Sequence, residues 1–203
     1  IVFGDWSSDV CSSDLHLPSV LMLDNKLRDQ SGTYTGNVIY LSTFSKILAP
    51  GLRLAWIIAP PEVIRKVVLA KQGADLHTAT FNQVVAYEVG HGGFIDKHVQ
   101  VINAVYRERR DAMLDSLSEH MPTGIQWTHP LGGLFLWITL PEQMRSTEIF
   151  REAVTERVAF VPGESFFPCG GGENTMRLNF SNCRPELINE GIARLGRVLR
   201  QRL

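Results

Sequence analysis

The segment LSTFSKILAPGLRLAW, residues 41–56, places one lysine, Lys46, between two apolar runs. Both runs, 37–44 and 52–59, are rich in β-branched and aromatic residues, a composition typical of buried strands. The tripeptide Ala49-Pro50-Gly51 between them favours a turn. Because lysine is normally a surface residue, Lys46 is either the solvated tip of a hairpin or an amine that the chain requires at this point.

The composition of the whole chain is that of a globular protein. Of 203 residues, 44% are hydrophobic and 20% are charged, enough to bury a core in one domain or in parts of two. A formal net charge of −1 gives no general attraction to nucleic acid or to an anionic membrane. No apolar stretch reaches the roughly 18–20 residues of a membrane span. The three cysteines include no CxxC pair, which favours reduced thiols in the cytoplasm, and the histidines and carboxylates show no metal-ligand spacing.

The first fifteen residues do not share this character. The stretch DWSSDVCSSDL, residues 5–15, has no helical or strand periodicity and is the translation of one reading frame of a common short-read sequencing adapter. We therefore expect residues 1–15 to be a non-native segment that takes no part in the fold.

Hydrophobic periodicity predicts helices and strands in the remainder of the chain. Strands that alternate with helices after Pro122 indicate a small α+β domain with its helices on one face of a sheet. Its start is expected at His91-Gly92-Gly93, and the arginines at the C-terminus are expected on the solvated face of the last helix. The expected helices are 61–74, 81–90, 94–121, 146–158 and 185–203, and the further strands are 125–129, 133–140, 159–162 and 175–181.

Five segments together resemble a known family. They resemble the C-terminal half of fold-type-I, pyridoxal-phosphate-dependent aminotransferases of class I/II, in the same order along the chain. The closest subgroup is the 2-aminoadipate, aromatic and kynurenine aminotransferases, which are related to MocR-type transcription regulators. The segments are TFSKILAPGLRLAWIIAPPEVI (43–64), LAKQGADLHTATFNQ (69–83), HPLGGLFLWITLP (129–141), VAFVPGESFFP (158–168) and MRLNFS (176–181).

The resemblance implies an α/β fold and a domain division. It assigns residues 16–92 to the C-terminal part of the large cofactor-binding domain, including the end of its sheet, and residues 93–203 to the complete small α+β domain. It also implies a homodimer, in which family active sites borrow residues from the partner.

The same resemblance gives four residues near Lys46 a role toward pyridoxal 5'-phosphate. Lys46 matches the lysine that attaches the cofactor covalently and serves as the catalytic base. Thr43 and Ser45 match two hydroxyls that bind the cofactor phosphate, and Arg53 matches the arginine that clamps it with paired donors. From the residues alone, Thr43 and Ser45 could instead be turn hydroxyls that bond the local backbone.

Arg177 is the candidate substrate-binding residue. In TMRLNFS, residues 175–181, apolar and polar side chains alternate as in a half-buried strand, so Arg177 could lie on a solvated strand face. The resemblance implies instead that it binds the substrate α-carboxylate, for which a bidentate arginine is suited. The Leu131-Gly132-Gly133 turn resembles a family loop whose backbone passes near the substrate, and it could also be a simple turn.

The resemblance implies transamination between an amino acid and a 2-oxo acid, and the cysteine content favours the cytoplasm. One alternative is the effector domain of a MocR-type regulator, which would share every motif and would be the one case with a nucleic-acid partner. Another is an inactive fragment, because the family's aspartate for the pyridine nitrogen lies upstream of the lysine. The sequence does not define which amino acid is the donor.

Overall fold

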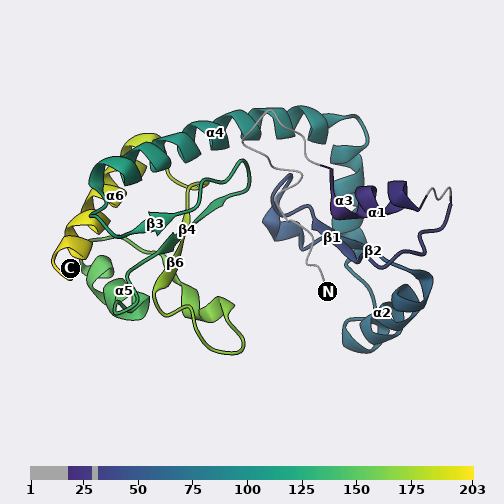
Figure 1. The fold of residues 1–203 in the computed structure, drawn as a ribbon. Coiled ribbons are helices and arrows are strands. Elements are labelled where there is room, and N and C mark those ends of the chain that lie inside the picture. The colour runs from purple at the N-terminus through teal and green to yellow at the C-terminus, as the bar shows by residue number, and fades with distance from the viewer. Residues whose placement is uncertain (1–17, 29–31) are drawn as a thin grey trace. The chain divides into compact units, whose positions relative to one another are not determined.

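The computed structural model describes residues 18–28 and 32–203, so the expected non-native segment 1–15 lies outside the described residues. The chain divides into two compact units, the first ending at Asn103 and the second spanning Ala104–Leu203. Figure 1 shows the elements of both. No helix within the described ranges is long and apolar enough to cross a membrane.

The first unit is built around the predicted hairpin. Strands β1 (Tyr40–Thr43) and β2 (Ala55–Ile58) pair antiparallel, with Thr43 opposite Ala55. Both strands are shorter than the expected runs: β2 starts later because Leu52 belongs to the 3₁₀ turn η1 (Pro50–Leu52), and β1 starts at Tyr40, which pairs with Ile58 at the end of β2. Within the described residues, the unit also contains the helices α1 (Val20–Leu27), α2 (Pro61–Ala74) and α3 (Thr80–Gly90), and the beginning of α4 (Phe94–His120).

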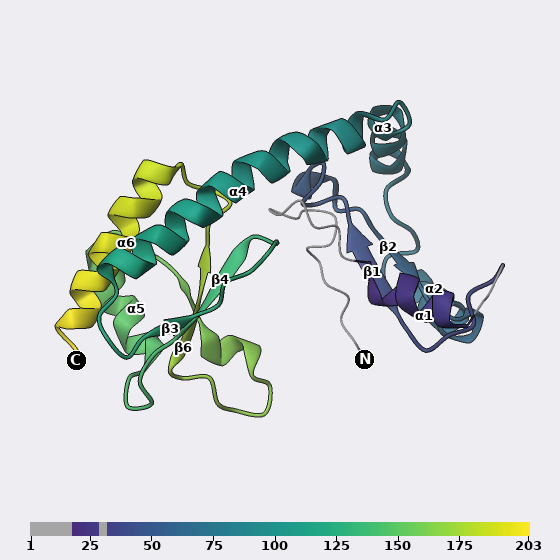
Figure 2. The same cartoon turned by 45° about the horizontal axis from the view of Figure 1, so that its top comes forward.

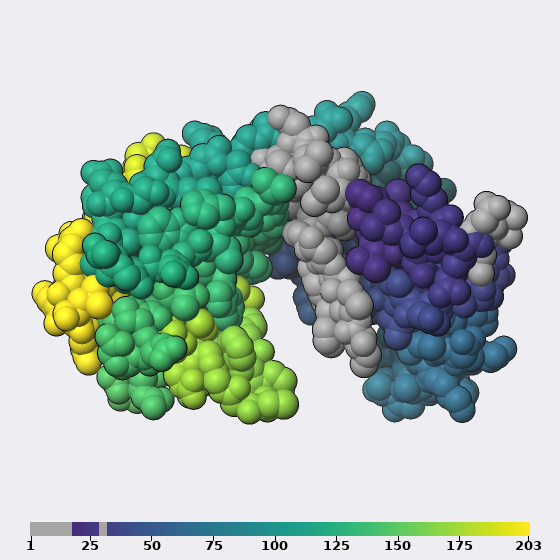
Figure 3. Space-filling view, in the orientation of Figure 1, coloured from purple at the N-terminus to yellow at the C-terminus, as the bar shows by residue number. Residues whose placement is uncertain are grey.

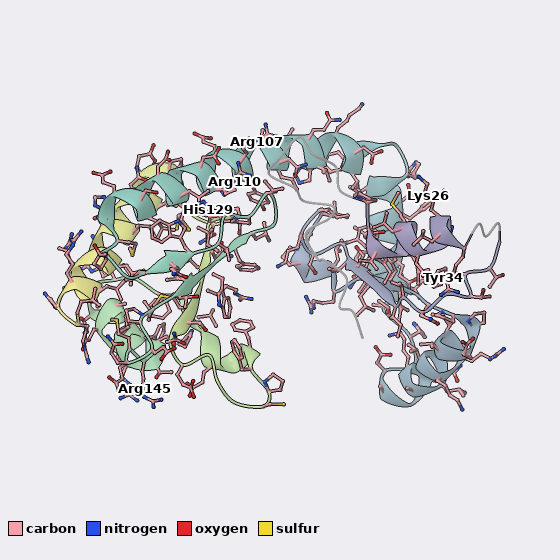
Figure 4. The ribbon with its side chains drawn as sticks, in the orientation of Figure 1. Lys26, Tyr34, Arg107, Arg110, His129 and Arg145 are labelled. Carbon is pink, nitrogen blue, oxygen red and sulfur yellow. The ribbon has the colours of Figure 1, made fainter. Side chains whose placement is uncertain are left out.

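Helix α1, to which the sequence analysis assigned no element, is fixed by a polar network. Its N-cap Ser19 accepts a hydrogen bond from the backbone N–H of Met22 at 3.2 Å. The hydroxyl of Tyr34 donates to Asp24 of α1 at 2.5 Å and accepts from the Val38 N–H at 2.9 Å, which connects α1 to the segment before β1. The hydrogen bond from Tyr34 lowers the pKa of Asp24. Figure 4 labels Tyr34 in this part of the chain.

The second unit contains a four-stranded antiparallel sheet. Its strand order is β3-β4-β6-β5, and Trp137 of β4 and Val161 of β5 both pair with Arg177 of β6. The elements are β3 (Gln126–Trp127), β4 (Phe135–Thr139), α5 (Ser146–Thr155), β5 (Val161–Pro162), the 3₁₀ turn η2 (Gly163–Phe166), β6 (Thr175–Asn179) and α6 (Pro185–Arg200).

Helix α4, Phe94–His120, begins in the first unit and ends in the second. The sequence analysis placed the domain boundary at 92/93, before this helix, whereas the compact units divide between Asn103 and Ala104. The division between the compact units has a physical reason within the helix. Tyr106 is the first α4 residue that packs against the core of the second unit, followed by Met113 and Leu117.

One face of the four-stranded sheet carries the hydrophobic core, and the helices cover that face, as expected from the sequence (Figure 2). Alternate residues of β4 and β6 point into it, so their neighbours Phe135, Trp137 and Arg177 lie on the opposite, half-buried face. The fully or almost fully buried core residues are Leu117 of α4, Leu136 and Ile138 of β4, Ile149 and Ala153 of α5, Met176 and Phe180 of the β6 segment, and Leu195 and Leu199 of α6.

The C-terminal arginines do more than face solvent. Arg200 donates to the carbonyl oxygen of His120 at the end of α4 at 2.7 Å, and Arg202 pairs with Glu152 of α5. Figure 3 shows the yellow end of α6 beside the green surface of α5. These contacts hold the end of α6 to both neighbouring helices, a role that the spacing of the arginines does not indicate.

Two glycines of α6 provide a matched test of this packing. A Cβ on Gly196 would lie 2.4 Å from the His120 carbonyl oxygen, whereas a Cβ on Gly191 would meet no atom within 4 Å. We expect Gly196→Ala to lower the free energy of unfolding by about 1–3 kcal/mol, because backbone must move. Gly191→Ala should raise it by about 0.5–1 kcal/mol through helix propensity. Urea denaturation measures both, and equal effects of the two substitutions would contradict the close crossing of α6 and α4.

Candidate functional site

A single backbone acceptor shapes the turn that carries Lys46. The N–H groups of Leu48 and Ala49 both donate to the carbonyl oxygen of Phe44, at 2.9 and 3.0 Å. Ile47 is buried and the Phe44 ring packs on Trp56 with centroids 5.0 Å apart, so apolar contacts anchor the turn on both sides of the lysine. The side chain of Lys46 itself is exposed. The runs that flank it, expected to be buried strands, are mostly half-buried, with Leu54 and Ala59 their buried apolar residues.

Arg53 adopts an unusual backbone conformation. It ends the η1 turn in the left-handed region, with φ 51° and ψ 39°, which a residue other than glycine seldom occupies. Its Nη1 donates to the Pro50 carbonyl oxygen at 3.2 Å. The neighbouring residues hold this geometry: Leu54 is buried, and Asn82 of α3 donates to the Leu52 carbonyl oxygen at 3.0 Å. A strained residue that its surroundings fix in place is typical of functional sites.

The hydroxyls of Thr43 and Ser45 form a connected pair. Thr43 Oγ1 lies 3.0 Å from the carbonyl oxygen of Leu54, to which it can only donate, and 2.8 Å from Ser45 Oγ. Because a hydroxyl has one proton, Ser45 is then the donor between the two hydroxyls. The Ser45 N–H also donates to Thr43 Oγ1 at 3.0 Å. Both roles considered for these hydroxyls therefore stay open, because Thr43 Oγ1 bonds the local backbone while both residues line a pocket.

The structure brings the four residues predicted near the lysine into one pocket. Thr43, Ser45, Lys46 and Arg53 line a cavity of about 280 Å³. Two cationic groups and two hydroxyls on one cavity form a donor set that matches a phosphate group, and the amine supplies a nucleophile beside it. These residues therefore fit a ligand that carries both a phosphate and a carbonyl. Pro50, Leu54 and Ala55 complete the lining.

A second pocket lies against the first and was not found by sequence reasoning. It has a volume of about 460 Å³ and shares Leu54 and Ala55 with the smaller cavity. Its other walls come from the Phe44 ring and from α3, including Ala86 and Tyr87. This pocket forms only when α3 packs against the hairpin, so no local sequence pattern predicts it.

Arg177 lies in the second unit in an aromatic environment. Its Cζ lies 4.0 Å from the centroid of the Phe135 ring and 4.7 Å from that of Phe166. Its side chain is half-buried, and among the described residues no carboxylate lies within ion-pair distance of it. Arg177 is therefore not a freely solvated strand-face arginine.

The predicted Leu131-Gly132-Gly133 turn is held by a residue that the sequence analysis missed. Arg110 of α4 donates from Nη1 to the Leu131 carbonyl oxygen at 3.1 Å. Figure 4 shows Arg110 on α4, close to His129 at the start of this loop. Arg109 donates to the Ser181 carbonyl oxygen after β6, so adjacent arginines fix both loops at one end of the sheet. The only signal in the sequence is the charged run RERR, 107–110.

This arrangement can be set beside known proteins. Residues 16–195 match the family described as aminotransferase class I and II. The chain belongs to this family. The resemblance seen in the sequence is thereby confirmed, and a pyridoxal phosphate cofactor is implied by the family. No cofactor is part of the structure, but the donors around Lys46 suit one.

Several aminotransferases are similar in sequence. The aromatic-amino-acid aminotransferase 1 of Thermococcus litoralis is 51% identical over 83% of this chain and 40% of its own length. The 2-aminoadipate transaminase of Thermus thermophilus is 44% identical over 98% of this chain and 49% of its own. The chain thus spans about half the length of the relatives it matches.

Solved aminotransferases share the fold. The α-aminoadipate aminotransferase of Thermus thermophilus, complexed with N-(5'-phosphopyridoxyl)-L-leucine, has a TM-score of 0.89 at 43% identity. This match covers 97% of the present chain and 49% of the other. The Pyrococcus horikoshii kynurenine aminotransferase gives 0.88 at 43%, with 97% and 46% covered. The predicted fold class, an α/β fold-type-I fragment, is confirmed.

Transcription regulators are also similar to this aminotransferase-family chain, at lower identity. The HTH-type regulator NorG of Staphylococcus aureus is 30% identical over 72% of this chain and 33% of its own length. This similarity is consistent with the alternative that the chain is part of a transcription regulator.

The left-handed conformation of Arg53 allows its fold and binding roles to be separated. Arg53→Gly should leave the free energy of unfolding unchanged or raise it by up to about 1 kcal/mol, because glycine adopts this region without strain. It should also weaken the binding of inorganic phosphate, since it removes one cation from the pocket. Denaturation and phosphate titration measure the two effects.

Arg157→Gly is the matched control, since Arg157 also has a positive φ, of 61°, and lies in the second unit. It should relieve strain in the same way and leave phosphate binding unchanged. Equal phosphate affinity in Arg53→Gly and the unsubstituted chain would remove Arg53 from the anion site.

Proposed function

We propose that the whole protein to which this chain belongs is a pyridoxal-phosphate-dependent aminotransferase. It exchanges the amino group of an amino acid with a 2-oxo acid. The observation that carries the proposal is the single pocket lined by Lys46, Thr43, Ser45 and Arg53, in a chain of the aminotransferase family. In the same proposal residues 16–92 belong to the cofactor-binding domain, and residues 93–203 form the small domain.

Three side chains would hold the cofactor by its phosphate. The guanidinium of Arg53 offers paired donors to two phosphate oxygens. Ser45 lies beside it and can turn its hydroxyl proton from Thr43 Oγ1 toward the same phosphate, whereas the Thr43 hydroxyl would have to release the Leu54 carbonyl oxygen to do so. Pyridoxal phosphate, when bound, supplies the ring that withdraws electrons from the substrate α-carbon.

Lys46 would act as nucleophile and then as base. Only its neutral amine can attack a carbonyl, and Lys46 lines the same pocket as the candidate phosphate-binding residues, which would bring a bound carbonyl within its reach. Once a substrate has replaced it, the free Nζ of Lys46 can accept the proton from the substrate α-carbon. The firm backbone of the 44–48 turn holds that amine at the pocket, so one side chain can serve both steps.

Arg177 would orient the substrate by its α-carboxylate. A guanidinium with no acidic neighbour among the described residues has its donors available for a bidentate carboxylate. In this proposal Arg177 discriminates amino acids and 2-oxo acids from amines and aldehydes, which lack the carboxylate.

We also propose that the protein is a cytoplasmic homodimer. Large apolar side chains of α1 and α3 are exposed, among them Leu27, Phe81 and Tyr87, and such surfaces often enter an interface. Cys169 and Cys183 are free thiols, which suits a reducing compartment.

The second candidate function is the effector domain of a transcription regulator. The similarity to the HTH-type regulator NorG favours it. Such a protein would bind DNA and hold the same cofactor without a requirement for turnover. Turnover of amino acids by the whole protein, without DNA binding, would decide for the enzyme.

Lys46→Ala tests the central assignment. The variant of the whole protein should lose the visible absorbance of the lysine-bound cofactor and lose transamination, because no other amine lines the pocket among the described residues. Lys66→Ala, an exposed lysine of α2, is the control and should keep both. Absorbance spectra and formation of 2-oxo acid are the measurements. Near-normal turnover by Lys46→Ala would show that another group carries the chemistry.

Arg177→Ala tests substrate binding. We expect catalytic efficiency toward amino acids to fall by roughly one to two decades, since a paired charged contact contributes about 1.5–3 kcal/mol. Cofactor absorbance should be retained. Arg184→Ala is the control, because that arginine is exposed and pairs only with Glu186 among the described residues. Steady-state kinetics measure the effect, and an unchanged KM would assign Arg177 to the strand face alone.

A further inference from the structure

The guanidinium of Arg177 is held by two aromatic rings that reach it from different elements. Phe135 belongs to β4, where it stands opposite Asn179, two positions from the Trp137–Arg177 pair. This register puts Phe135 diagonally across from Arg177 on the same face of the sheet, within reach of a long side chain. Its ring centroid is 4.0 Å from the Arg177 Cζ.

Phe166 approaches from the η2 turn after β5. The turn lies tightly against β6, because a Cβ on Gly163 would fall 1.9 Å from Thr175 Oγ1 and 2.8 Å from the Thr175 carbonyl oxygen. This close approach places the Phe166 centroid 4.7 Å from the Arg177 Cζ. Trp137 meets the Phe166 ring edge-on, with centroids 5.3 Å apart and an interplanar angle of 77°, and so supports it from the side.

Ring contacts and carboxylate contacts use different parts of a guanidinium. Cations are attracted to the faces of aromatic rings, and a guanidinium can present its own flat face to them. Its N–H donors lie in the plane and point outward from its edges. Aromatic neighbours therefore restrict the rotamers of Arg177 and attract its charge without occupying the donors, whereas an acidic neighbour would compete for them.

We propose that Phe135 and Phe166 are positioning residues that hold the Arg177 guanidinium in place for a ligand carboxylate. The inference rests on the proposed function, in which Arg177 binds the substrate α-carboxylate. It adds two residues, distant in sequence, that determine how strongly the protein selects ligands that bear that group.

The test compares two inhibitors that differ only in the carboxylate. Inhibition constants of 3-phenylpropanoate and 3-phenylpropanamide are measured with the whole protein and its cofactor. Their ratio reports carboxylate recognition, because a general distortion of the site weakens both ligands together. Phe135→Leu and Phe166→Leu remove a ring at similar volume, Phe135→Tyr and Phe166→Tyr retain it, and Arg177→Ala gives the ratio without the cation.

We expect each leucine variant to reduce the selectivity ratio roughly threefold to tenfold, the range of a partly desolvated cation–π contact. Each tyrosine variant should keep the selectivity ratio of the unsubstituted protein. KM for the amino acid should rise in the leucine variants with little change in kcat, because the rings do not touch the reacting atoms. Phe167→Leu is the control: its ring packs near Trp137, at 6.3 Å, without lying over Arg177, and should leave the ratio unchanged.

The outcomes separate this inference from the proposed function. A ratio that Arg177→Ala leaves intact would overturn the role of Arg177 itself. A ratio that falls in Arg177→Ala but not in either leucine variant would overturn only the positioning role of the rings. Tyrosine keeps the aromatic face. Tyrosine variants that lowered the selectivity ratio as much as the leucine variants would therefore also overturn the positioning role of the rings.

Discussion

The carbonyl oxygen of Leu54 is the point on which the lysine pocket depends. It accepts the N–H of Phe44 at 3.1 Å and the hydroxyl of Thr43 at 3.0 Å, so the two arms of the hairpin are joined just where the lysine turn begins. Arg53 immediately precedes this carbonyl and Lys46 follows the first arm by three residues. Moving Leu54 would therefore displace the amine, the guanidinium and the hydroxyl pair together.

The four residues to which the family resemblance assigned a role near Lys46 lie within a short stretch of chain. Thr43, Ser45, Lys46 and Arg53 span eleven residues, and a single hairpin is enough to bring them together. The strands and helices were also predictable, because hydrophobic periodicity is a property of neighbouring residues. The C-terminal sheet could be recognised for the same reason, with its helices on one face.

Contacts between distant residues could not be predicted in this way. Phe135 and Phe166 reach Arg177 through strand register and a tight 3₁₀ turn, and neither leaves a local signal. The sequence left open whether Lys46 is a solvated turn residue or an amine required at a site, because apolar flanks do not show where a turn side chain points; in the structure this side chain is exposed. Likewise, the pairing of Arg202 with Glu152 depends on how α6 crosses α5.

Arg177 has no acidic partner among the described residues, and this places stability and recognition in conflict. Val161 is its cross-strand partner on β5, and an acidic residue there would form a favourable cross-strand ion pair. Selection for thermal stability alone would favour such a replacement, yet the new carboxylate would sit on the donors that a ligand needs. At the exposed strand position of Val161, a substitution that raised the stability of the fold would thus also act as a built-in competitive inhibitor.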